Sequence, residues 1–463
     1  MIAVSYSEII RAVEGRLLQG EDMLSKRVKD VSIDTRTLKG GELFVALQGP
    51  HHDAHDFLSQ AARKGAAGFM VQSWPARRGA ALRGLPVIQV KDTTVALGQL
   101  AGLVRSKSTA RVIGVTGSTG KTLTKDFLAS VLQRNYKTVA SQGSFNNEVG
   151  VPLTLLSIKP STEMVVLEMG SRGPGHIAQL CSFAKPDAGI VTNVGVTHYK
   201  YFKSEENVAL AKAELLKAIP PEGFCVLNAD EPRYKWLARR CGGKDFCFGT
   251  SRASQVRGED LRVNDRGKPS FTIMYNGSRI GIDLPLPGRH NLYNALAAAA
   301  CSLALGLGLE QVKAGLEKAR LTEWRMEMFK TSEGVTILND CYNSNPAAMK
   351  AALKSLADID ASGKLIVVLG DMAELGSISE EAHHRVGELV VESGADVLIT
   401  VGKRARDIAS AARHRGLPRG SVFPTRDVVQ AAEVLRSVLE PEDMVLIKGS
   451  RSLGMERLAH SLA

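Results

Sequence analysis

The sequence has few aromatic residues and no closely paired cysteines. Aromatic side chains make up 5% of the 463 residues, so the stacking surfaces on which single-stranded nucleic acids bind are scarce. The cysteines show no C-x-x-C spacing, which argues against a zinc site, and a chain of this length buries a core without disulfide bonds. We therefore expect reduced thiols at all six positions, Cys181, Cys225, Cys241, Cys247, Cys301 and Cys341.

Long apolar runs are also missing. The most apolar stretch, residues 295–309, is rich in alanine and shorter than the roughly 20 residues that span a bilayer, so it predicts a buried helix. Residues 1–18 are broken by charged side chains and lack the continuous apolar segment of a secretory signal. We expect a cytoplasmic protein with no membrane insertion.

The chain carries an excess of positive charge, with a formal net charge of +11 at pH 7. Such an excess is compatible with nucleic-acid binding. The basic residues are scattered, however, and form only small groups such as those at 403–406 and 413–415. We therefore predict a solvated basic surface that suits anionic substrates, and no nucleic-acid partner. A P-loop ATPase that depends on nucleic acid is kept as the alternative from a different class.

Length and pattern predict an α/β protein of three domains. At about 150 residues per domain, a chain of this size corresponds to roughly three. Residues 1–88 predict a small α/β domain, and residues 89–319 alternate apolar strands with helices, which is typical of a mostly parallel sheet. Residues 320–463 repeat the alternation and resemble a doubly wound, Rossmann-like domain, in which ligands bind beyond the carboxyl ends of the strands.

Short β-rich runs and the helices between them define the two larger domains. In the central segment we predict helices at 121–133 and 206–218, and strands at 111–116, 164–168, 188–193 and 224–228. Turn residues at 264–267 and 276–277 lie within an alternating stretch, 261–286, and predict a small antiparallel addition. In the last segment the predicted strands are 335–338, 365–369, 397–401 and 444–447.

A glycine-rich loop between a strand and a helix predicts a phosphate-binding site. The strand at 112–116 is followed by Gly117, Ser118, Thr119, Gly120, Lys121, Thr122 and Leu123. Backbone N–H groups of such a loop surround phosphate oxygens, the lysine neutralises charge, and the threonine hydroxyl is a ligand for Mg²⁺. Val115 stands where the usual motif has its first glycine. The loop still predicts an enzyme that uses ATP and Mg²⁺.

The loop and several further motifs resemble those of the Mur ligase family, whose phosphate loop also lacks the first glycine. The resemblance covers nearly the whole chain. The runs Tyr-Asn-Ser-Asn-Pro, Gly-Asp-Met-Ala-Glu-Leu-Gly and Lys-Gly-Ser-Arg favour the family member that adds a dipeptide. The segments that carry the resemblance are 32–36, 41–47, 144–152, 168–170, 288–291, 342–346, 370–376 and 448–451.

The resemblance implies an ATP-dependent ligase of peptidoglycan precursor synthesis. Such an enzyme joins D-alanyl-D-alanine to UDP-N-acetylmuramoyl-tripeptide through an acyl phosphate, and we expect it to be a monomer. The first domain would bind the UDP-sugar, the second ATP and the third the incoming dipeptide. Two ligases of the same mechanism stay open: a sibling that adds a single amino acid, and a folylpolyglutamate synthase. The folate enzyme would not need the segment at 34–49, which argues against it.

The resemblance also implies roles for residues around the phosphate loop. Lys121, Lys212 and His198 are expected to be catalytic, with Lys212 carbamylated by CO₂. The ligands of Mg²⁺ would be Thr122, Glu168, His198 and the Lys212 carbamate. Glu168 ends a predicted strand, which by itself places the carboxylate at the sheet edge beside the loop. The plain alternatives are a solvated carboxylate for Glu168 and a surface lysine paired with a glutamate for Lys212.

Further ATP contacts are implied on the side of the last domain. Asn291 and Asn294 would lie beside the adenine, Asp340 beside the ribose and Arg325 beside the phosphates. The plain alternative for Asn291 is helix capping. Arg325 lies in the linker to the third domain, where a hinge would bring it onto ATP.

The UDP-sugar would be bound by Asp34, Thr35 and Arg36, with Asn146 and Asn147 supporting it near the reaction centre. Without the resemblance, the first and third of these residues would form an ordinary surface ion pair.

Two segments depart from the family pattern. Tyr199 and Lys200 replace a Leu-Glu pair after His198, which changes the charge near the predicted metal site. Ala54 stands where glycine is typical, in a segment implied to contact the nucleotide sugar.

Overall fold

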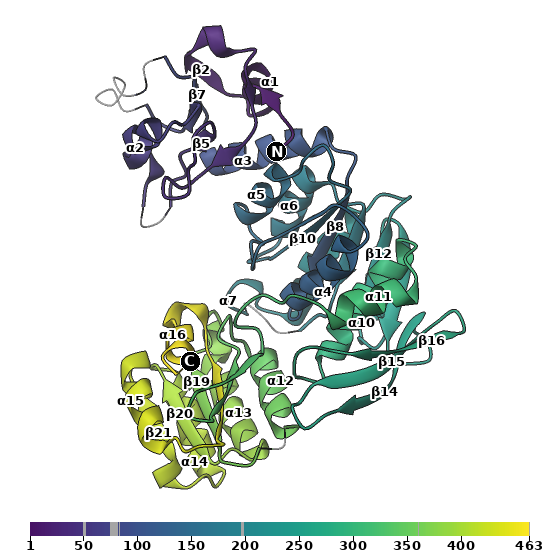
Figure 1. Cartoon of the computed structure of the whole chain (residues 1–463), viewed down its shortest axis with the longest axis vertical. Helices are drawn as coiled ribbons and strands as arrows, with labels where there is room; N and C mark the ends of the chain where they lie inside the picture. Colours follow the sequence, from purple (N-terminus) through teal and green to yellow (C-terminus); the bar gives the residue numbers. More distant parts are fainter. Residues whose placement is uncertain (50–51, 75–81, 83, 196–198, 360, 463) are drawn as a thin grey trace.

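Three α/β units follow one another along the long axis of the molecule (Figure 1). The computed structural model describes residues 1–49, 52–74, 82, 84–195, 199–359 and 361–462. The first unit lies at one end, the central unit in the middle, and the last unit at the other end with the carboxyl terminus. Their sheets occupy residues 16–89, 111–283 and 327–448. The predicted domain boundaries at 88 and 319 stay predictions.

The first unit is a small sheet with short helices. Its strands in spatial order are β2 (Arg16–Gln19), β7 (Val87–Gln89), β6 (Gly68–Val71), β5 (Leu43–Val45) and β4 (Val31–Ser32). Strand β2 pairs antiparallel with β7 and the others are parallel. A separate ribbon of β1 (Val4–Ser5) and β3 (Arg27–Val28) lies beside α1 (Tyr6–Ala12). Helix α2 (Leu58–Arg63) completes the unit. Helix α1 begins with a capping box in which Ser5 and Glu8 exchange hydrogen bonds.

The central unit is a sheet that is parallel except at one edge. Its strands in spatial order are β9 (Thr138–Ala140), β10 (Met164–Glu168), β8 (Arg111–Thr116), β11 (Ala188–Val191), β12 (Phe224–Asn228), β13 (Lys244–Gly249), β14 (Val256–Val263), β15 (Pro269–Tyr275) and β16 (Ser278–Asp283). Strands β14, β15 and β16 are joined by antiparallel pairing. Strands β10 and β11 are buried along their whole length, as expected for a parallel sheet covered on both faces. The predicted parallel sheet with an antiparallel addition is confirmed.

Helices cover both faces of the central sheet. They are α3 (Thr93–Ser106), α4 (Lys121–Gln133), α5 (Gly150–Leu156), α6 (His176–Ala184), α7 (Tyr199–Phe202), α8 (Glu205–Lys217), α9 (Tyr234–Ala238), α10 (Asn291–Ala304) and α11 (Leu309–Glu317). Helix α10 is the predicted buried alanine-rich helix. Its small side chains have no exposed surface at 297–300, and the helix packs against α4. This contact fixes the helix that follows the phosphate loop.

The last unit is a second sheet with helices on its faces. Its strands in spatial order are β17 (Glu327–Lys330), β18 (Thr336–Asn339), β22 (Met444–Lys448), β19 (Leu365–Gly370), β20 (Val397–Val401) and β21 (Val422–Thr425). Only β17 is antiparallel to its neighbour. The helices are α12 (Pro346–Ala357), α13 (Ser379–Glu392), α14 (Ala405–His414), α15 (Val428–Val438) and α16 (Glu456–His460). The four predicted strands are present, and the edge strands β17 and β21 were not predicted.

A contact that includes buried apolar side chains joins the antiparallel hairpin of the central unit to the end of α12 in the last unit. At the hairpin tip, Gly267 approaches Ile359 so closely that a Cβ atom on the glycine would lie 2.6 Å from Cγ1 of the isoleucine. Nearby, Nε of Arg289 donates to Oδ2 of Asp358 at 2.8 Å, and the arginine side chain is 54% exposed.

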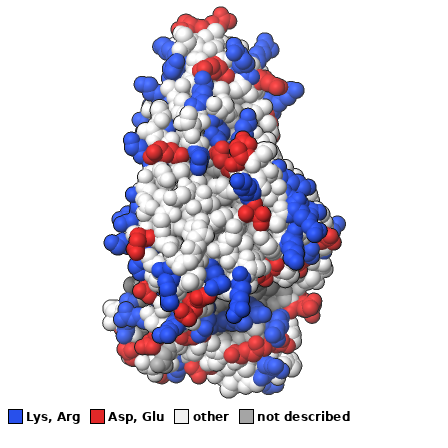
Figure 2. Space-filling view, turned by 90° about the vertical axis from the view of Figure 1, so that its right-hand side faces the viewer, with Lys and Arg blue, Asp and Glu red and all other residues white. Residues whose placement is uncertain are grey.

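Charged side chains of both signs are spread over the face shown in Figure 2. Blue and red groups alternate over most of it, with one larger blue group at mid-height beside an uncharged area. In the part of the chain that the structure describes, no helix is long and apolar enough to cross a membrane.

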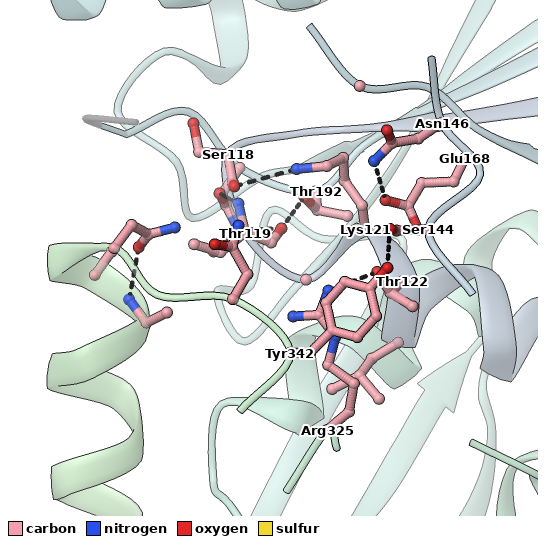
Figure 3. A pocket seen from close by; sticks show the side chains of 18 of the residues that line it. Ser118, Thr119, Lys121, Thr122, Ser144, Asn146, Glu168, Thr192, Arg325 and Tyr342 are labelled. Atoms are coloured by element: carbon pink, nitrogen blue, oxygen red, sulfur yellow. Dashed lines mark hydrogen bonds between the residues drawn. The ribbon is translucent and has the colours of Figure 1, made fainter. Parts of the chain in front are cut away.

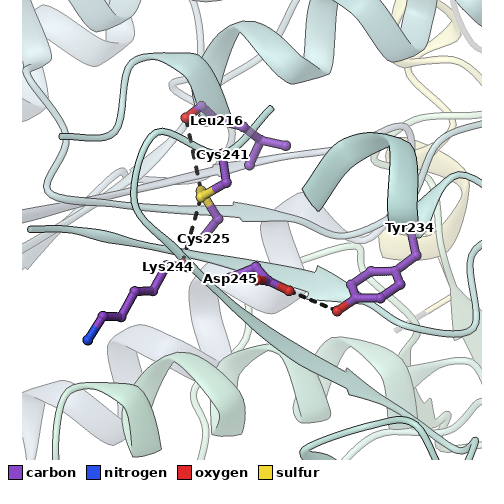
Figure 4. The surroundings of a disulfide bond; sticks show 6 residues. All are labelled: Leu216, Cys225, Tyr234, Cys241, Lys244 and Asp245. Carbon is purple, nitrogen blue, oxygen red and sulfur yellow. Dashed lines mark hydrogen bonds between the residues drawn. A yellow bond between two sulfur atoms is a disulfide. The ribbon is translucent and has the colours of Figure 1, made fainter. Parts of the chain in front are cut away.

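The prediction of six reduced thiols is wrong for one pair. Cys225, in β12, and Cys241, after α9, form a disulfide with their Cα atoms 6.2 Å apart (Figure 4). The chain folds back through α9 before entering β13, which brings the two cysteines together although their separation of 16 residues matches no short motif. The other cysteines are free and buried, as predicted: Cys181, Cys247, Cys301 and Cys341.

We predict that thiol titration of the denatured protein will find four free thiols without reductant and six after reduction. A disulfide that closes a loop of this size stabilises a protein by about 3 kcal/mol. Reduction should therefore lower the free energy of unfolding in urea by a similar amount. Six titratable thiols in the unreduced protein would contradict the assignment.

Candidate active site

A cavity of about 760 Å³ lies between the central unit and the last unit (Figure 3). Its walls come from the phosphate loop, the segment that leads into α5, the end of β10, and helices α8 and α10. The opposite wall comes from the linker and from the loops that follow β18 and β22. The cavity therefore lies at the carboxyl ends of parallel strands from two sheets, as predicted for an α/β ligand site.

The phosphate loop runs from the end of β8 into α4. Gly117, with φ +148°, lies against the hydroxyl of Thr192, so a Cβ atom there would collide with it. The same hydroxyl donates to the carbonyl of Thr119 at 2.6 Å, and the backbone N–H of Thr119 donates to Oδ1 of Asn193 at 3.0 Å. The two residues after β11 thus tether the loop. Sequence reasoning missed them, and the only signal was their place at a strand end.

Lys121 is the first residue of α4, and its ammonium group folds back over the loop. Its Nζ donates to the carbonyls of Gly117 at 2.8 Å and Ser118 at 3.2 Å. Burial lowers the pKa of Lys121, Glu168 opposes that shift, and the charge of Arg325 adds to it. A bound polyphosphate would supply the negative charge that compensates this buried ammonium group.

Glu168 is buried at the end of β10 with one oxygen unused. Its Oε1 accepts a hydrogen bond from Nδ2 of Asn146 at 2.7 Å (Figure 3). Its Oε2 is buried and has no hydrogen-bond partner among the described residues. An orphaned carboxylate oxygen beside a phosphate loop, with the hydroxyl of Thr122 also lining the cavity, fits the donor set of a Mg²⁺ site. The remaining predicted ligand, His198, lies outside the described residues.

Lys212 reaches the same cavity from α8. Its side chain is 1% exposed and lies beside the ring of Phe202, with Nζ 6.0 Å from the ring centroid. The pKa of Lys212 is lowered to about 7, chiefly by burial and also by the charge of Lys121, while Glu214 opposes the shift. A large part of this lysine is then neutral at physiological pH, which is the form that reacts with CO₂. The structure brings Lys121, Glu168 and Lys212 together and does not support a solvated surface lysine.

The predicted adenine residues are arranged one behind the other. Asn294 lines the cavity and meets the loop, since a Cβ atom on Gly120 (φ +78°) would collide with its Oδ1. Its Nδ2 donates to Oδ1 of Asn291 at 2.9 Å. Asn291 is fully buried, donates to the carbonyl of Pro287 at 2.8 Å, and is absent from the cavity lining. The capping alternative for Asn291 is wrong, because the N-cap of α10 is His290.

Two predicted residues come from the far wall of the cavity. Nη2 of Arg325 donates to Oγ1 of Thr122 at 3.0 Å, so the linker already touches the phosphate loop. Asp340 accepts a hydrogen bond from Nζ of Lys448 at 2.5 Å. Both residues of this buried ion pair line the cavity.

A tyrosine that sequence reasoning assigned no role joins both walls. The ring of Tyr342 lies 4.1 Å from Cζ of Arg325, and its hydroxyl is hydrogen-bonded to Oγ of Ser144 (Figure 3). On the other side, Cζ of Arg451 lies 5.8 Å from the ring centroid. The only signal was the position of this tyrosine in the Tyr-Asn-Ser-Asn-Pro run.

The predicted UDP-sugar residues are divided between two places. Asp34, Thr35 and Arg36 follow β4 in the first unit and are not among the described residues that line the cavity. Hydrogen bonds from Arg36 hold the pKa of Asp34 below its usual value, and the arginine side chain is 87% exposed. Asn146 and Asn147 do line the cavity, although Oδ1 of Asn147 also accepts the first backbone N–H groups of α5.

The positions that depart from the family pattern lie in short helices. Lys200, in α7, donates its backbone N–H to the carbonyl of Glu374 at 3.2 Å, so α7 contacts the last unit. Ala54 opens a short 3₁₀ helix, residues Ala54–Phe57, in the first unit.

A phosphate loop that faces a second α/β unit across a cleft, with an unpaired carboxylate and a buried lysine between them, fits an enzyme site that binds a nucleotide through its phosphates. Residues 115–302 match the Mur ligase middle domain, and residues 324–451 match the domain described as "Mur ligase, glutamate ligase domain". The chain belongs to the Mur ligase family.

Individual relatives resemble the chain over its full length. It is 37% identical to the UDP-N-acetylmuramoyl-tripeptide–D-alanyl-D-alanine ligase of Escherichia coli K12, over 100% of this chain and 99% of that protein. The crystal structure of MurF from Acinetobacter baumannii superposes with a TM-score of 0.88 at 28% identity, covering 99% of this chain and 98% of that one. MurF ligase from Thermotoga maritima in complex with ADP gives a TM-score of 0.80 at 26% identity, covering 94% and 96%.

We predict that the buried amine of Lys212 makes the stability of the protein pH-dependent. Its pKa is about 7 in the folded protein and about 10.4 in an unfolded chain, so between these values only the unfolded chain binds the proton. Lys212 therefore contributes nothing to the free energy of unfolding above the unfolded pKa. As the pH falls towards 7, it lowers that free energy by up to about 1.4 kcal/mol per pH unit.

The measurement is urea unfolding of wild type and Lys212→Met in CO₂-free buffers between about pH 7.5 and 9.5. The difference between the two free energies of unfolding should grow with pH in favour of the wild type. Lys217→Met, at an exposed position of the same helix, is the matched control. A difference that does not change with pH would show that the amine stays charged.

Proposed function

We propose that this enzyme joins D-alanyl-D-alanine to UDP-N-acetylmuramoyl-tripeptide at the expense of ATP, in peptidoglycan precursor synthesis in the cytoplasm, as a monomer. The observation that carries the proposal is the meeting of Lys121, Glu168 and Lys212 in one cavity at the phosphate loop. The full-length similarity to a ligase named for these two substrates supports it. A sibling ligase that adds a single amino acid and a folylpolyglutamate synthase are not favoured by that similarity.

The phosphate loop is proposed to hold the ATP phosphates through its backbone N–H groups and Lys121. Mg²⁺ would be held by Glu168, Thr122, His198 and a carbamate formed on Lys212. When bound, it would neutralise charge on the phosphates. Asn294 and Asp340 line the cavity where the nucleoside part would lie, and Asn291 would support Asn294 from behind rather than touch the base.

The chemistry follows from the poor reactivity of a carboxylate anion towards amines. A carboxylate oxygen of the tripeptide forms a bond to the γ-phosphorus of ATP, the bond to the bridging oxygen breaks, and ADP leaves. The amine of the dipeptide then attacks the acyl carbon and loses a proton, and inorganic phosphate leaves. Lys121 offsets the repulsion between the two anions in the first step.

The three units are proposed to divide the substrates among them. The first would bind the uridine nucleotide through Asp34, Thr35 and Arg36, with Asn146 and Asn147 near the reacting carboxylate. The central unit would bind ATP and the last the dipeptide. Water destroys an acyl phosphate, so separate units that close together suit this chemistry.

The proposal is tested by phosphate release with UDP-N-acetylmuramoyl-tripeptide, comparing D-alanyl-D-alanine with single amino acids and with no acceptor amine. We expect release only with the dipeptide. With an ¹⁸O-labelled tripeptide carboxylate, the label should appear in the released phosphate. Release that is independent of the dipeptide but stimulated by DNA or RNA would instead favour a nucleic-acid-dependent ATPase.

We predict that Lys121→Ala and Glu168→Gln will each lower kcat by about 10²–10³-fold, as loss of one electrostatic contact to a developing charge does in other enzymes. Glu168→Gln keeps the shape and the hydrogen bond to Asn146 but removes the charge, so it should also raise the Mg²⁺ concentration for half-maximal activity. The readouts are steady-state rates across a Mg²⁺ titration. An unchanged Mg²⁺ requirement in Glu168→Gln would remove this carboxylate from the metal site.

A further inference from the structure

Arg325 is presented to the phosphate loop by a strained linker. The residues on either side of it are not glycines, yet Trp324 has φ +61° and Met326 has φ +54°. Such residues in the left-handed region cost conformational free energy and persist only where surrounding contacts hold them. The guanidinium group between them contacts Thr122 at 3.0 Å and stacks on Tyr342.

Contacts within the last unit hold the linker on one side. The backbone N–H of Trp324 donates to Oε2 of Glu327 at 3.3 Å, and that of Met326 donates to Oδ1 of Asp340 at 3.3 Å. These acceptors belong to the last unit, so they position the arginine relative to that unit and not relative to the phosphate loop.

A contact from the central unit holds the linker on the other side. Oδ2 of Asp126, on α4, accepts a hydrogen bond from the backbone N–H of Thr322 at 2.8 Å. The carboxylate is 8% exposed, and its Oδ1 is paired with Nζ of Lys125 at 2.7 Å. Asp126 is not among the described residues that line the cavity, and nothing in the proposed reaction uses it.

We propose that Asp126 is a positioning residue that sets Arg325 against the phosphate loop. Asp126 ties the linker (residues 318–326, between α11 and β17) to α4, the helix that begins with Lys121. The positions of Lys121 and Arg325 are therefore both set by α4. The inference rests on the proposed contact between Arg325 and ATP.

The test is the Kd of a non-hydrolysable ATP analogue with Mg²⁺, measured by calorimetry on the full chain. Loss of a hydrogen bond or contact to a charged group weakens binding about tenfold, which is expected for Asp126→Ala and for Arg325→Ala. Because the aspartate acts through the arginine, the double variant should also be weakened about tenfold, not about a hundredfold. An Asp126→Ala variant with wild-type affinity, or additive losses in the double variant, would overturn the proposal.

Matched variants separate positioning from general destabilisation. Asp443 is 1% exposed and accepts the backbone N–H groups of Lys364 and Glu440 at 2.8 Å each, hydrogen bonds in which the linker takes no part. Asp443→Ala should lower the Tm as Asp126→Ala does and leave the Kd unchanged, whereas an equal loss of affinity in both variants would overturn the proposal. Asp126→Asn keeps an acceptor oxygen and should largely restore binding.

Two further results keep this inference distinct from the proposed function. Thr322→Pro removes the same hydrogen bond from the donor side, so it should weaken binding of the ATP analogue about tenfold. This variant tests the role of the hydrogen bond if Asp126→Ala does not fold. If no acceptor supports ligation but the binding pattern holds, only the choice of substrates in the proposed function is wrong.

Discussion

Two buried lysines that repel each other determine the character of the cavity. Lys121 and Lys212 both have pKa values lowered by burial, and the charge of the first contributes to the shift of the second. Taking an ammonium group out of water is costly unless an anion compensates it. Glu168 compensates only part of this charge, so the cavity favours a ligand with several negative charges. Affinity for polyphosphate therefore follows from the positive charge that the carboxylate of Glu168 leaves uncompensated.

The topology of the two large sheets allows these groups to meet. The carboxyl ends of β8, β10 and β11 provide the loop, the carboxylate and the tethering residues, while β18 and β22 provide Asp340 and Lys448 from the opposite side. Neither sheet holds a complete site. Residues from both line the cavity, so its shape depends on how the units are arranged.

Local patterns in the sequence were sufficient to predict much of this arrangement. The strands of the central sheet are buried on both faces, so they appear in the sequence as short apolar runs. The antiparallel hairpin is indicated by alternating apolar and polar residues and by turn residues. The phosphate loop and the strand-end position of Glu168 are likewise local. The short edge strands β9, β17 and β21 gave no such signal, because pairing with a neighbour defines them more than their own composition does.

The parts that could not be predicted depend on distant contacts. No pattern pairs Cys225 with Cys241, since the turn through α9 brings them together. Nor does the sequence reveal that Asn291 lies behind Asn294, or that Thr192 and Asn193 brace the loop. The burial of a side chain and its hydrogen-bond partners are set by the tertiary structure. A motif that contains two asparagines therefore does not indicate which of them faces the cavity.

The contact between the hairpin and α12 has a consequence for how easily the last unit swings. Its ion pair, Arg289 with Asp358, is largely open to solvent on the arginine side, and exposed pairs are worth about 0–1 kcal/mol and are screened by salt. The fit of Gly267 against Ile359 is steric and insensitive to electrolytes. Ionic strength will therefore adjust the stiffness of this joint only slightly, because its apolar contact at the hairpin tip does not depend on screening.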